Sequence, residues 1–173
     1  MIRTQSDRMT GKNGSWHIEL DGISQETALK IAERDDVVSI GAVTIFNPDG
    51  ELPYRMDGKR VVLYGIDESY LTMNSTGAAE GRFPQGMGEI MLSSNAARVL
   101  QVAVGDTVTL RTPSGDWDFT VSGLGGVEES YYSGQYSLMD AYLPRTAFAA
   151  LMEQNNVHNL QTSYYVCLLY TSD

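Results

Sequence analysis

Apolar and polar residues alternate along two neighbouring stretches in the middle of the 173-residue chain. In residues 107–111 the apolar positions are Val108 and Leu110, and residues 117–124 begin with the same alternation. A period of two places every second side chain on one face of a strand. The sequence Pro-Ser-Gly-Asp at 113–116 is a turn signal. We therefore predict a β-hairpin with one buried face.

A short helix is predicted on the N-terminal side of this hairpin. A Gly/Pro-rich turn at 81–88 leads into an apolar strand at 89–93, and Ser94 or Asn95 is suited to begin the helix as its N-cap. Four apolar residues then recur at helical spacing and offer a buried stripe: Ala96, Ala97, Val99 and Leu100. The middle of the chain is thus expected to form a strand, a helix and a hairpin.

Towards both ends of the chain, strands alternate with amphipathic helices. Strands are predicted at 16–20, 37–46, 60–65, 141–143 and 161–166, and helices at 25–34, 67–73 and 146–154. This order predicts an α+β core domain over residues 16–166, with strand–helix–strand edges. A β-rich subdomain is expected to be inserted in its middle, at about 47–126.

Polar and small-residue segments separate these elements. Residues 1–15 are polar and are expected to be frayed, residues 74–80 to form a loop and residues 123–126 a turn. Ser24 is suited to cap the first helix. On that helix we expect the following side chains to be buried: Ala28, Leu29, Ile31 and Ala32.

The net charge of the chain is −10, with 20% charged and 42% hydrophobic residues. A protein of this acidity is repelled by nucleic acid and by anionic membrane surfaces, so neither is expected as a direct partner. No stretch approaches the ~20 apolar residues that a membrane helix needs. A chain of this length can nevertheless bury about 70% of the surface that it exposes when unfolded, so a full core is expected.

Residues 167–173 have an explanation other than a terminal strand. Their codons can be TGTCTCTTATACACATCTGAC, which resembles the transposon end and adapter used to make sequencing libraries. We expect that the reading frame ran into adapter, so that the natural protein continues differently after Val166. The alternative is a genuine strand, because residues 164–170 are apolar and aromatic. Cys167 is the one cysteine, which excludes an internal disulfide in either case.

No motif for catalysis or for cofactor or metal binding stands out. His17 and His158 fit no metal-binding spacing, and alternation along the first strand directs His17 to solvent. Residues 123–126 are glycine-rich but lack the GK[ST] ending of a phosphate loop. The adjacent carboxylates at 35–36 and 128–129 point apart, which favours a solvated surface over an acid–base pair. We therefore expect no catalytic, cofactor-binding or metal-binding residues.

Two further groups are candidates for a bracing or a contact role. Arg82 and Glu89 flank the Gly/Pro-rich turn, whose irregular backbone needs partners, so we expect Arg82 to brace it and Glu89 to cap or pair at the strand start. The polar loop at 128–140 carries three tyrosines: Tyr131, Tyr132 and Tyr136. Tyrosine offers a large contact area at low entropic cost, so this loop is a candidate partner surface. The alternative is that the three rings pack back onto the domain.

The central unit resembles the MacB-like extracytoplasmic (periplasmic) core domain of FtsX-like ABC transporter permeases. The residues that match the family motif are Gly81, Arg82, Pro84, Glu89, Ile90, Gly105, Asp106 and Gly123. Residues 14–17 also resemble the start of this domain beyond the first membrane helix, and residues 141–144 the strand that follows the central motif. Together these pieces cover most of residues 14–155.

The resemblance implies a domain that is not an enzyme and that lies on the outer face of the cell membrane. It implies coupling of a partner ATPase to export or to mechanical transmission, with a separate ATP-binding subunit and a second permease half as partners. An extracellular peptide or protein is a further implied partner. The resemblance also implies a membrane helix before Met1 and further helices after Val166. Two alternatives stay open: a free-standing extracellular binding module and a soluble hydrolase whose site is assembled from scattered residues.

Overall fold

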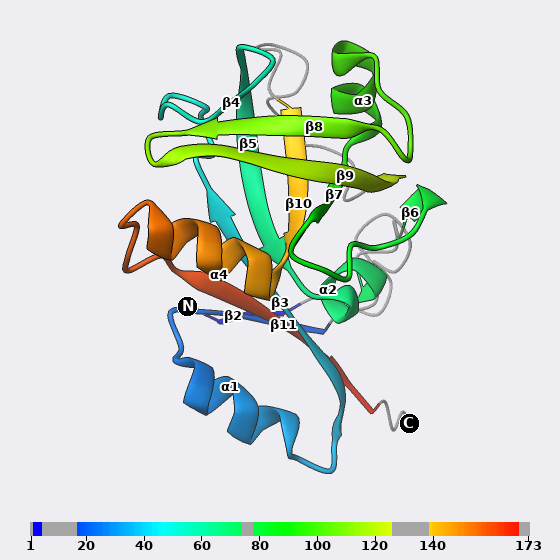
Figure 1. The fold of residues 1–173 in the computed structure, drawn as a ribbon. Helices are drawn as coiled ribbons and strands as arrows, with labels where there is room; N and C mark the ends of the chain where they lie inside the picture. The colour runs from blue at the N-terminus through cyan, green and yellow to red at the C-terminus, as the bar shows by residue number, and fades with distance from the viewer. Residues whose placement is uncertain (1, 5–16, 74–77, 126–138, 170–173) are drawn as a thin grey trace.

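One 11-stranded sheet and four helices form the part of the chain that the structure describes. The computed structural model describes residues 2–4, 17–73, 78–125 and 139–169 (Figure 1). The strands are β1 (Ile2–Thr4), β2 (Ile18–Asp21), β3 (Val37–Phe46), β4 (Arg55–Met56), β5 (Lys59–Ile66), β6 (Ala78–Gly81), β7 (Glu89–Leu92), β8 (Thr107–Thr112), β9 (Gly115–Gly125), β10 (Met139–Pro144) and β11 (Thr162–Leu168). The helices are α1 (Gln25–Ala32), α2 (Glu68–Met73), α3 (Ser94–Leu100) and α4 (Arg145–Gln154).

Strand β5 belongs to two parts of this sheet. In the first part the strands pair in the order β5-β10-β7-β9-β8-β4, and β4 also pairs with β5, which closes the path into a ring of strands (Figure 1). The ring encloses apolar side chains that are at most 1% exposed, among them Leu63, Ile90, Leu110, Phe119 and Leu143. Helices α3 and α4 add apolar side chains to the same core. Burial of this apolar surface is the main force that holds the ring together.

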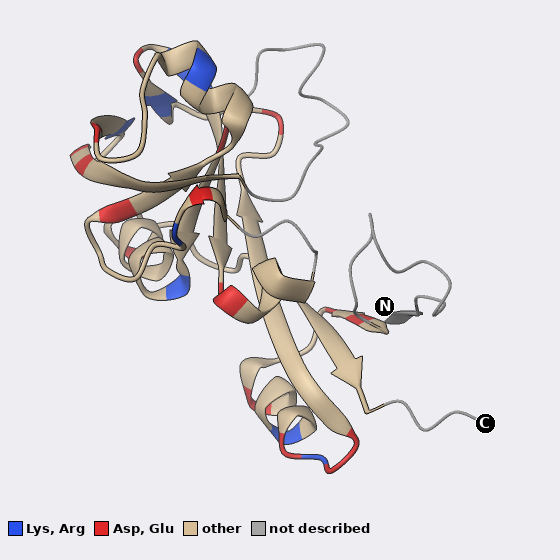
Figure 2. Ribbon diagram, turned by 90° about the vertical axis from the view of Figure 1, so that its right-hand side faces the viewer, with Lys and Arg blue, Asp and Glu red and all other residues tan. Residues whose placement is uncertain are grey.

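The second part of the sheet is an open limb, made of β1, β2, β11, β3 and α1. Strand β3 pairs with β5 on one side and with β11 on the other, and β11 pairs with β2. Because β11 is antiparallel to both neighbours, β2 and β3 run parallel with β11 between them, and α1 connects them as a split β-α-β unit. Figure 2 shows the limb projecting away from the ring, with α1 on one of its faces.

The hairpin and the helix before it are confirmed. Strands β8 and β9 are antiparallel, and Val108 and Leu110 are 7% and 0% exposed. The cap of α3 is Ser93, however, so the prediction of Ser94 or Asn95 is wrong by one or two residues. The Ser93 hydroxyl accepts from the Ala96 N–H (3.1 Å), while the Ser93 N–H donates to the Asp140 carbonyl of β10. That tertiary bond keeps Ser93 extended, and an extended residue is what an N-cap requires.

The cap of α1 is also confirmed, since the Ser24 hydroxyl accepts from the Thr27 N–H at 3.1 Å. The helix ends earlier than expected, at Ala32. Ala28 is buried, but Leu29 is 59% exposed, so its predicted burial is wrong. Helix α1 packs against strand β3 of the limb, and most of the Leu29 side chain stays outside this contact.

Three segments predicted as frayed, loop or turn contain strand residues. Residues Ile2–Thr4 pair with β2, and Ala78–Gly81 form β6 against β9. Residues 123–125 continue β9 instead of forming a turn, because β7 and β6 lie on either side of them. None of these segments has a strong strand pattern. Their backbone hydrogen bonds come from pairing with a distant strand, which the local sequence does not predict.

Strand β2 is covered on both faces, so the simple alternation predicted for it is wrong. Glu19, which alternation would place on the same solvent-facing side as His17, is only 8% exposed, and its side chain is hydrogen-bonded to the Tyr165 hydroxyl. The ring of Tyr165 lies 5.2 Å from that of Tyr70 on α2, which covers this second face. His17 is half-buried, and its Nδ1 accepts from the Leu168 N–H (3.1 Å), so it does not simply face solvent.

The predicted α+β class is confirmed, with helices at the strand–helix–strand edges and a β-rich middle. The division into residues 16–166 and an inserted part at about 47–126 stays a prediction, because the sheet runs without a break from the limb through β5 into the ring. The origin of residues 167–173 also stays a prediction. Within them, Cys167 and Leu168 continue β11 beside Ser39 and Val37.

Candidate functional site

Two parallel strands, β5 and β10, end side by side at one edge of the sheet. Ile66, the last residue of β5, pairs with Pro144, the last residue of β10. The next residues in the chain are Asp67 and Arg145, and each stands at the start of a helix, α2 or α4. The carboxyl ends of parallel strands are a common place for ligand sites, because the following helices open a crevice there.

The carboxylate of Asp67 accepts hydrogen bonds from backbone N–H groups. It accepts from the Tyr70 N–H (2.8 Å), which makes Asp67 the N-cap of α2, and from the Ala42 N–H of β3 (3.1 and 3.2 Å). Burial raises the pKa of Asp67, while these backbone bonds and the positive charge of Arg145 lower it. Asp67 therefore fixes α2 against β3 and also contributes negative charge to this edge.

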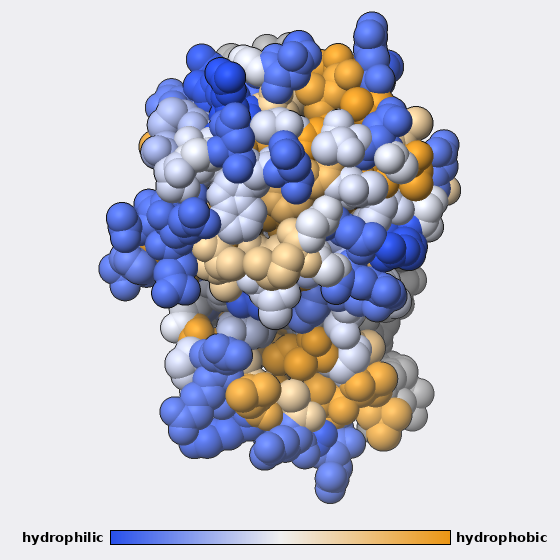
Figure 3. Space-filling model, in the orientation of Figure 1, coloured by the Kyte–Doolittle hydropathy of each residue, from blue (hydrophilic) through white to orange (hydrophobic). Residues whose placement is uncertain are grey.

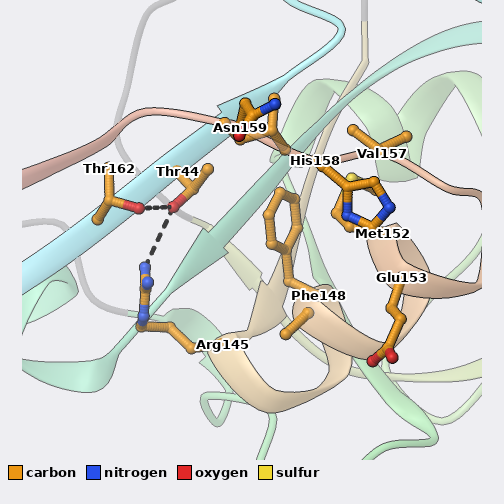
Figure 4. Close-up of a pocket in the computed structure, with 11 residues that line it drawn as sticks. Thr44, Arg145, Phe148, Met152, Glu153, Val157, His158, Asn159 and Thr162 are labelled. Carbon is orange, nitrogen blue, oxygen red and sulfur yellow. Dashed lines mark hydrogen bonds between the residues drawn. The ribbon is translucent and has the colours of Figure 1, made fainter. Parts of the chain in front are cut away.

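Arg145 extends from the first turn of α4 towards β3 and β5. It donates to the Thr44 hydroxyl (3.3 Å) and to the Gly65 carbonyl (3.5 Å). The Thr44 hydroxyl lies 2.6 Å from the Thr162 hydroxyl of β11, which is a hydrogen bond in which either can be the donor (Figure 4). All of these partners are neutral, and no ion pair of Arg145 occurs with the described residues.

A cavity of about 400 Å³ opens between α4 and the start of β11, and we call it the α4 cavity. Arg145 and the two threonines lie on one side of it (Figure 4). Its apolar wall consists of Phe148, Met152, Val157 and Leu160, and its other polar members are Glu153, His158 and Asn159. The cavity thus combines an apolar wall with one group of hydrogen-bonding side chains, which is the usual make-up of a small-molecule pocket.

A second cavity, of about 230 Å³, lies between α1 and the limb sheet, and we call it the α1 cavity. Asp67 and Arg145 line it, together with Leu29, Ile40 and Tyr164. Arg145 therefore lies between the two cavities. Figure 3 shows apolar surface gathered in the lower part of the molecule, where α1 and the limb lie.

Asp140 is a buried acid on the outer face of the ring, only 5% exposed. The Tyr64 hydroxyl donates to its carboxylate (3.3 Å), and the Tyr64 ring stacks on that of Tyr142 at 4.8 Å. Burial raises the pKa of Asp140 to about 6, and the bond from Tyr64 opposes the rise. Burial also raises the pKa of Tyr64, so its hydroxyl keeps its proton and remains a donor.

Arg82 and Glu89 brace the Gly/Pro-rich turn. The Arg82 guanidinium donates to both carboxylate oxygens of Glu89, one of them at 2.8 Å, and the Gln85 N–H donates to the same carboxylate (2.9 Å). The bond from Arg82 holds the pKa of Glu89 below its usual range. The arginine side chain is 53% exposed, so solvent screens most of the attraction between the two charges. The geometry of the pair fixes the turn more than it stabilises the domain.

The remaining motif residues hold β6, β7 and β9 together. Gly81 has a φ of +69°, and a side chain there would collide with the Ser122 carbonyl, while one at Gly123 would meet the Arg82 carbonyl at 2.5 Å. Glycine is required where two backbones approach so closely. The other members are buried or hydrogen-bonded in place: Pro84, Ile90, Gly105 and Asp106. Every motif residue therefore has a bracing or packing contact in the described part of the chain.

The other sequence candidates do not come together. His158 is exposed at the rim of the α4 cavity, and residues 35–36 are exposed after α1. Tyr131, Tyr132 and Tyr136, and residues 128–129, lie outside the described residues. Within residues 2–4, 17–73, 78–125 and 139–169, no group of three or more His, Cys, Asp or Glu side chains could hold a metal ion. The expectation that the chain has no catalytic, cofactor-binding or metal-binding residues stays a prediction.

Sequence analysis missed the residues at the strand ends, Asp67 and Arg145. The sequence does contain a signal for them. Asp67 and Arg145 each directly follow the last residue of an apolar strand, Ile66 and Pro144, and stand where the next helix starts. What the sequence lacks is any sign that β5 and β10, separated by most of the ring, pair in parallel.

The sequence profile of a protein family described as the MacB-like periplasmic core domain matches residues 1–169. No protein with a curated description matched the chain. Among the residues that the structure describes, no helix is long and apolar enough to cross a membrane.

Three solved structures show similarity in fold. The periplasmic region of MacB from Actinobacillus actinomycetemcomitans has a TM-score of 0.63 and 14% identity, over 89% of this chain and 68% of that one. The extracellular domain of the noncanonical ABC-type transporter YknZ from Gram-positive bacteria has a TM-score of 0.56 and 14% identity, over 83% and 72%. A domain of a permease protein from Porphyromonas gingivalis has a TM-score of 0.57 and 17% identity, over 94% and 66%.

Proposed function

Because the chain belongs to the family of MacB-like periplasmic core domains of ABC transporter permeases, we propose that it couples a partner ATPase to export or to mechanical transmission across the membrane. The observation that carries the proposal is the match to this family over residues 1–169. The fold similarity to the periplasmic region of MacB and to the extracellular domain of YknZ supports the same architecture.

The continuity of the sheet supports a mechanical role. Strand β3 pairs with β11 in the limb and with β5 in the ring, so one set of backbone hydrogen bonds connects the two parts. Gly41 on β3 lies directly against the backbone of Tyr70 on α2, which packs the helix onto this connection. A displacement of the limb is therefore passed to the ring through hydrogen bonds and close backbone contact, not through a flexible linker.

The proposed partners are a separate ATP-binding subunit and a second permease half. In this arrangement the domain lies outside the membrane, and membrane helices before residue 1 and after residue 166 connect it to the ATPase. An extracellular peptide or protein is a further proposed partner, with Tyr131, Tyr132 and Tyr136 as candidate contacts. This topology rests on the family.

The location can be tested in the full-length permease by thiol labelling. We place a cysteine at Ser114, which is exposed in the β8–β9 hairpin, in a full-length protein whose other cysteines are replaced by serine. An impermeant maleimide added to intact cells is expected to label Ser114→Cys. A matched control, Ala147→Cys, has a side chain that is 1% exposed and is expected to react only after unfolding. Labelling of Ser114→Cys only after lysis would place the domain in the cytoplasm and end the permease proposal.

The coupling can be tested separately in reconstituted membranes. Replacement of residues 17–169 by a short polar linker is expected to leave ATP hydrolysis by the complex measurable but to abolish export or the response to an external partner. Transport that continues at the wild-type rate would contradict coupling through this domain, even if the labelling result stands.

The second candidate function, a free-standing binding module, is favoured by one observation. The α4 cavity has the size and the mixed lining of a small-molecule pocket. Fractionation of cells that express the full-length protein distinguishes this candidate, because a free-standing module would be recovered in the medium or periplasm and not in the membrane fraction.

A further inference from the structure

We propose that the α4 cavity binds the carboxylate of a small organic acid with an apolar body, through the Arg145 guanidinium and the hydroxyl pair of Thr44 and Thr162. The proposal concerns the isolated chain, and it holds whether or not the domain belongs to a transporter complex.

The first argument is the unused binding capacity of Arg145. A guanidinium has five N–H donors in a planar fork that fits a carboxylate. Arg145 is half-buried, and its two bonds, to Thr44 and to the Gly65 carbonyl, are made by one terminal nitrogen at 3.3 and 3.5 Å. Both acceptors are neutral. The remaining donors have no anionic acceptor among the described residues, which leaves a partly desolvated positive charge at the cavity wall.

The second argument is a count of hydroxyl protons. Thr44 and Thr162 share one hydrogen bond of 2.6 Å, and Thr44 also accepts from Arg145. Two hydroxyls have two protons, and the bond between them uses one. Whichever residue donates, the other still has a proton to offer. A carboxylate beside Arg145 can accept it, whereas a cation there would be repelled by the like charge of Arg145.

The helix α4 adds positive potential at the same place. Its N-cap is Pro144, which provides no side-chain hydrogen bond, and Arg145 is its first residue. The first turn of a helix carries uncapped N–H groups and partial positive charge, so a cation there is unfavourable by itself. An anion bound beside Arg145 removes this conflict.

The apolar wall defines the rest of the ligand. Phe148 and Met152 are 6% and 4% exposed and lie along one side of the cavity, with Val157 and Leu160 completing the wall. Figure 4 shows Arg145 and Glu153 on opposite sides of Phe148. A carboxylate is therefore directed to the Arg145 end, because Glu153 repels it from the other. A volume of about 400 Å³ suits a short acyl chain or one apolar amino acid residue.

Asp67 is the group that opposes this binding. It lies on the other side of Arg145, in the α1 cavity, and its oxygens are engaged by the Tyr70 and Ala42 N–H groups. Asp67 and Arg145 attract each other without forming an ion pair. The Asp67 charge therefore weakens binding of an anion but occupies none of the guanidinium donors, and we expect affinities in the submillimolar range, on the order of 100 µM.

Calorimetric titration of the whole chain tests the proposal with matched pairs of probes. Octanoate is compared with octanamide, which has the same chain without the charge, and N-acetyl-leucine with N-acetyl-leucinamide. The two acids distinguish a fatty acid from a peptide C-terminus as the natural source. We expect saturable binding of at least one acid and a loss of about 10-fold or more for its amide, because charge-assisted hydrogen bonds are the strong ones.

Three variants locate the site. Arg145→Gln is expected to weaken binding about 10- to 100-fold. Thr162→Val is expected to weaken it about 3- to 10-fold, because it removes one of the two hydroxyls of the hydrogen-bonded pair beside Arg145. Arg111→Gln is the matched control, because Arg111 is an exposed arginine on β8 outside both cavities. This variant should bind the acid with the wild-type affinity. If Arg145→Gln does not fold, Arg145→Lys replaces it, with an expected loss of at least about 3-fold because lysine lacks the fork.

Amide ¹H–¹⁵N spectra provide the structural readout. Octanoate or N-acetyl-leucine should shift the resonances of Thr44, Thr162 and Phe148 and leave those of the β8–β9 hairpin in place. The proposal is overturned if neither acid binds below about 10 mM, if an amide binds as well as its acid, or if folded Arg145 and Thr162 variants keep the wild-type affinity.

Discussion

The buried acid Asp140 allows a sharp test of the electrostatics of this fold. Asp140 is 5% exposed, and burial raises the pKa of its carboxyl from 3.8 to about 6. In the unfolded chain the same carboxyl is solvated and ionises at its ordinary pKa. Between these two values the folded state therefore holds a proton that the unfolded state has lost.

The sign of the effect follows from this proton. Stability changes with pH in proportion to the protons bound by the unfolded state minus those bound by the folded state, and here that difference is negative. Asp140 therefore lowers the free energy of unfolding as pH rises from about 4 to about 6, and above pH 6 the cost is constant. A difference of about two pKa units corresponds to about 3 kcal/mol at neutral pH.

Replacement of Asp140 by asparagine removes the charge at nearly constant shape. The gain in stability of Asp140→Asn relative to the wild type should increase by about 1.4 kcal/mol between pH 5 and pH 7.5, the part of the titration that falls in this range. Urea unfolding followed by tryptophan fluorescence at both pH values measures it, and this range avoids the isoelectric point near 4.5. Asp35→Asn, at an exposed position, is the control and should show no such increase.

The Tyr64→Phe variant tests the direction independently. It removes the hydroxyl that donates to Asp140, so the pKa of Asp140 should rise further and the loss of stability should be greater at pH 7.5 than at pH 5. The reasoning is refuted if the stability difference between Asp140→Asn and the wild type is the same at both pH values, because Asp140 would then not titrate between them.

Three further predictions follow from the core, the motif and the charge. Leu110→Ala should lower the free energy of unfolding by about 2–5 kcal/mol in urea titrations, since Leu110 is 0% exposed, whereas Thr107→Ala on the outer face of β8 should stay within about 0.5 kcal/mol. Gly81→Ala should lower the free energy of unfolding by more than about 1 kcal/mol in the same assay, because the alanine side chain would collide with the Ser122 carbonyl. Gly86→Ala, with open space around residue 86, should lower it by less, and equal values for the two variants would contradict the close backbone approach at Gly81. The isolated chain should bind neither ATP nor DNA in calorimetric titrations at physiological salt, given its net charge of −10 and the missing GK[ST] ending, and micromolar binding of either would contradict this.

The sequence by itself determined the local elements of this protein and its family. Alternation of Val108 and Leu110 with polar residues fixes which face of β8 is buried, because successive side chains on a strand point to opposite faces. Ser24 determines where α1 begins, since its hydroxyl satisfies an N–H of the first turn. The glycines at 81 and 123 mark a close backbone approach, and their order and spacing carry the resemblance to the family.

Only the tertiary structure decided what these elements bring together. Local pattern did not predict that Glu19 is buried and Leu29 is exposed. Glu19 is buried because α2 covers its face of β2, and Leu29 is exposed because most of its side chain lies outside the contact between α1 and the limb. The site at Arg145 depends on long-range pairing in the same way. Thr44 and Thr162 meet because β3 pairs with β11 across more than a hundred residues of sequence, and Arg145 reaches them because β10 lies parallel to β5. Strand partners are chosen by the burial of a shared core, which is a property of the whole chain and not of any segment of it.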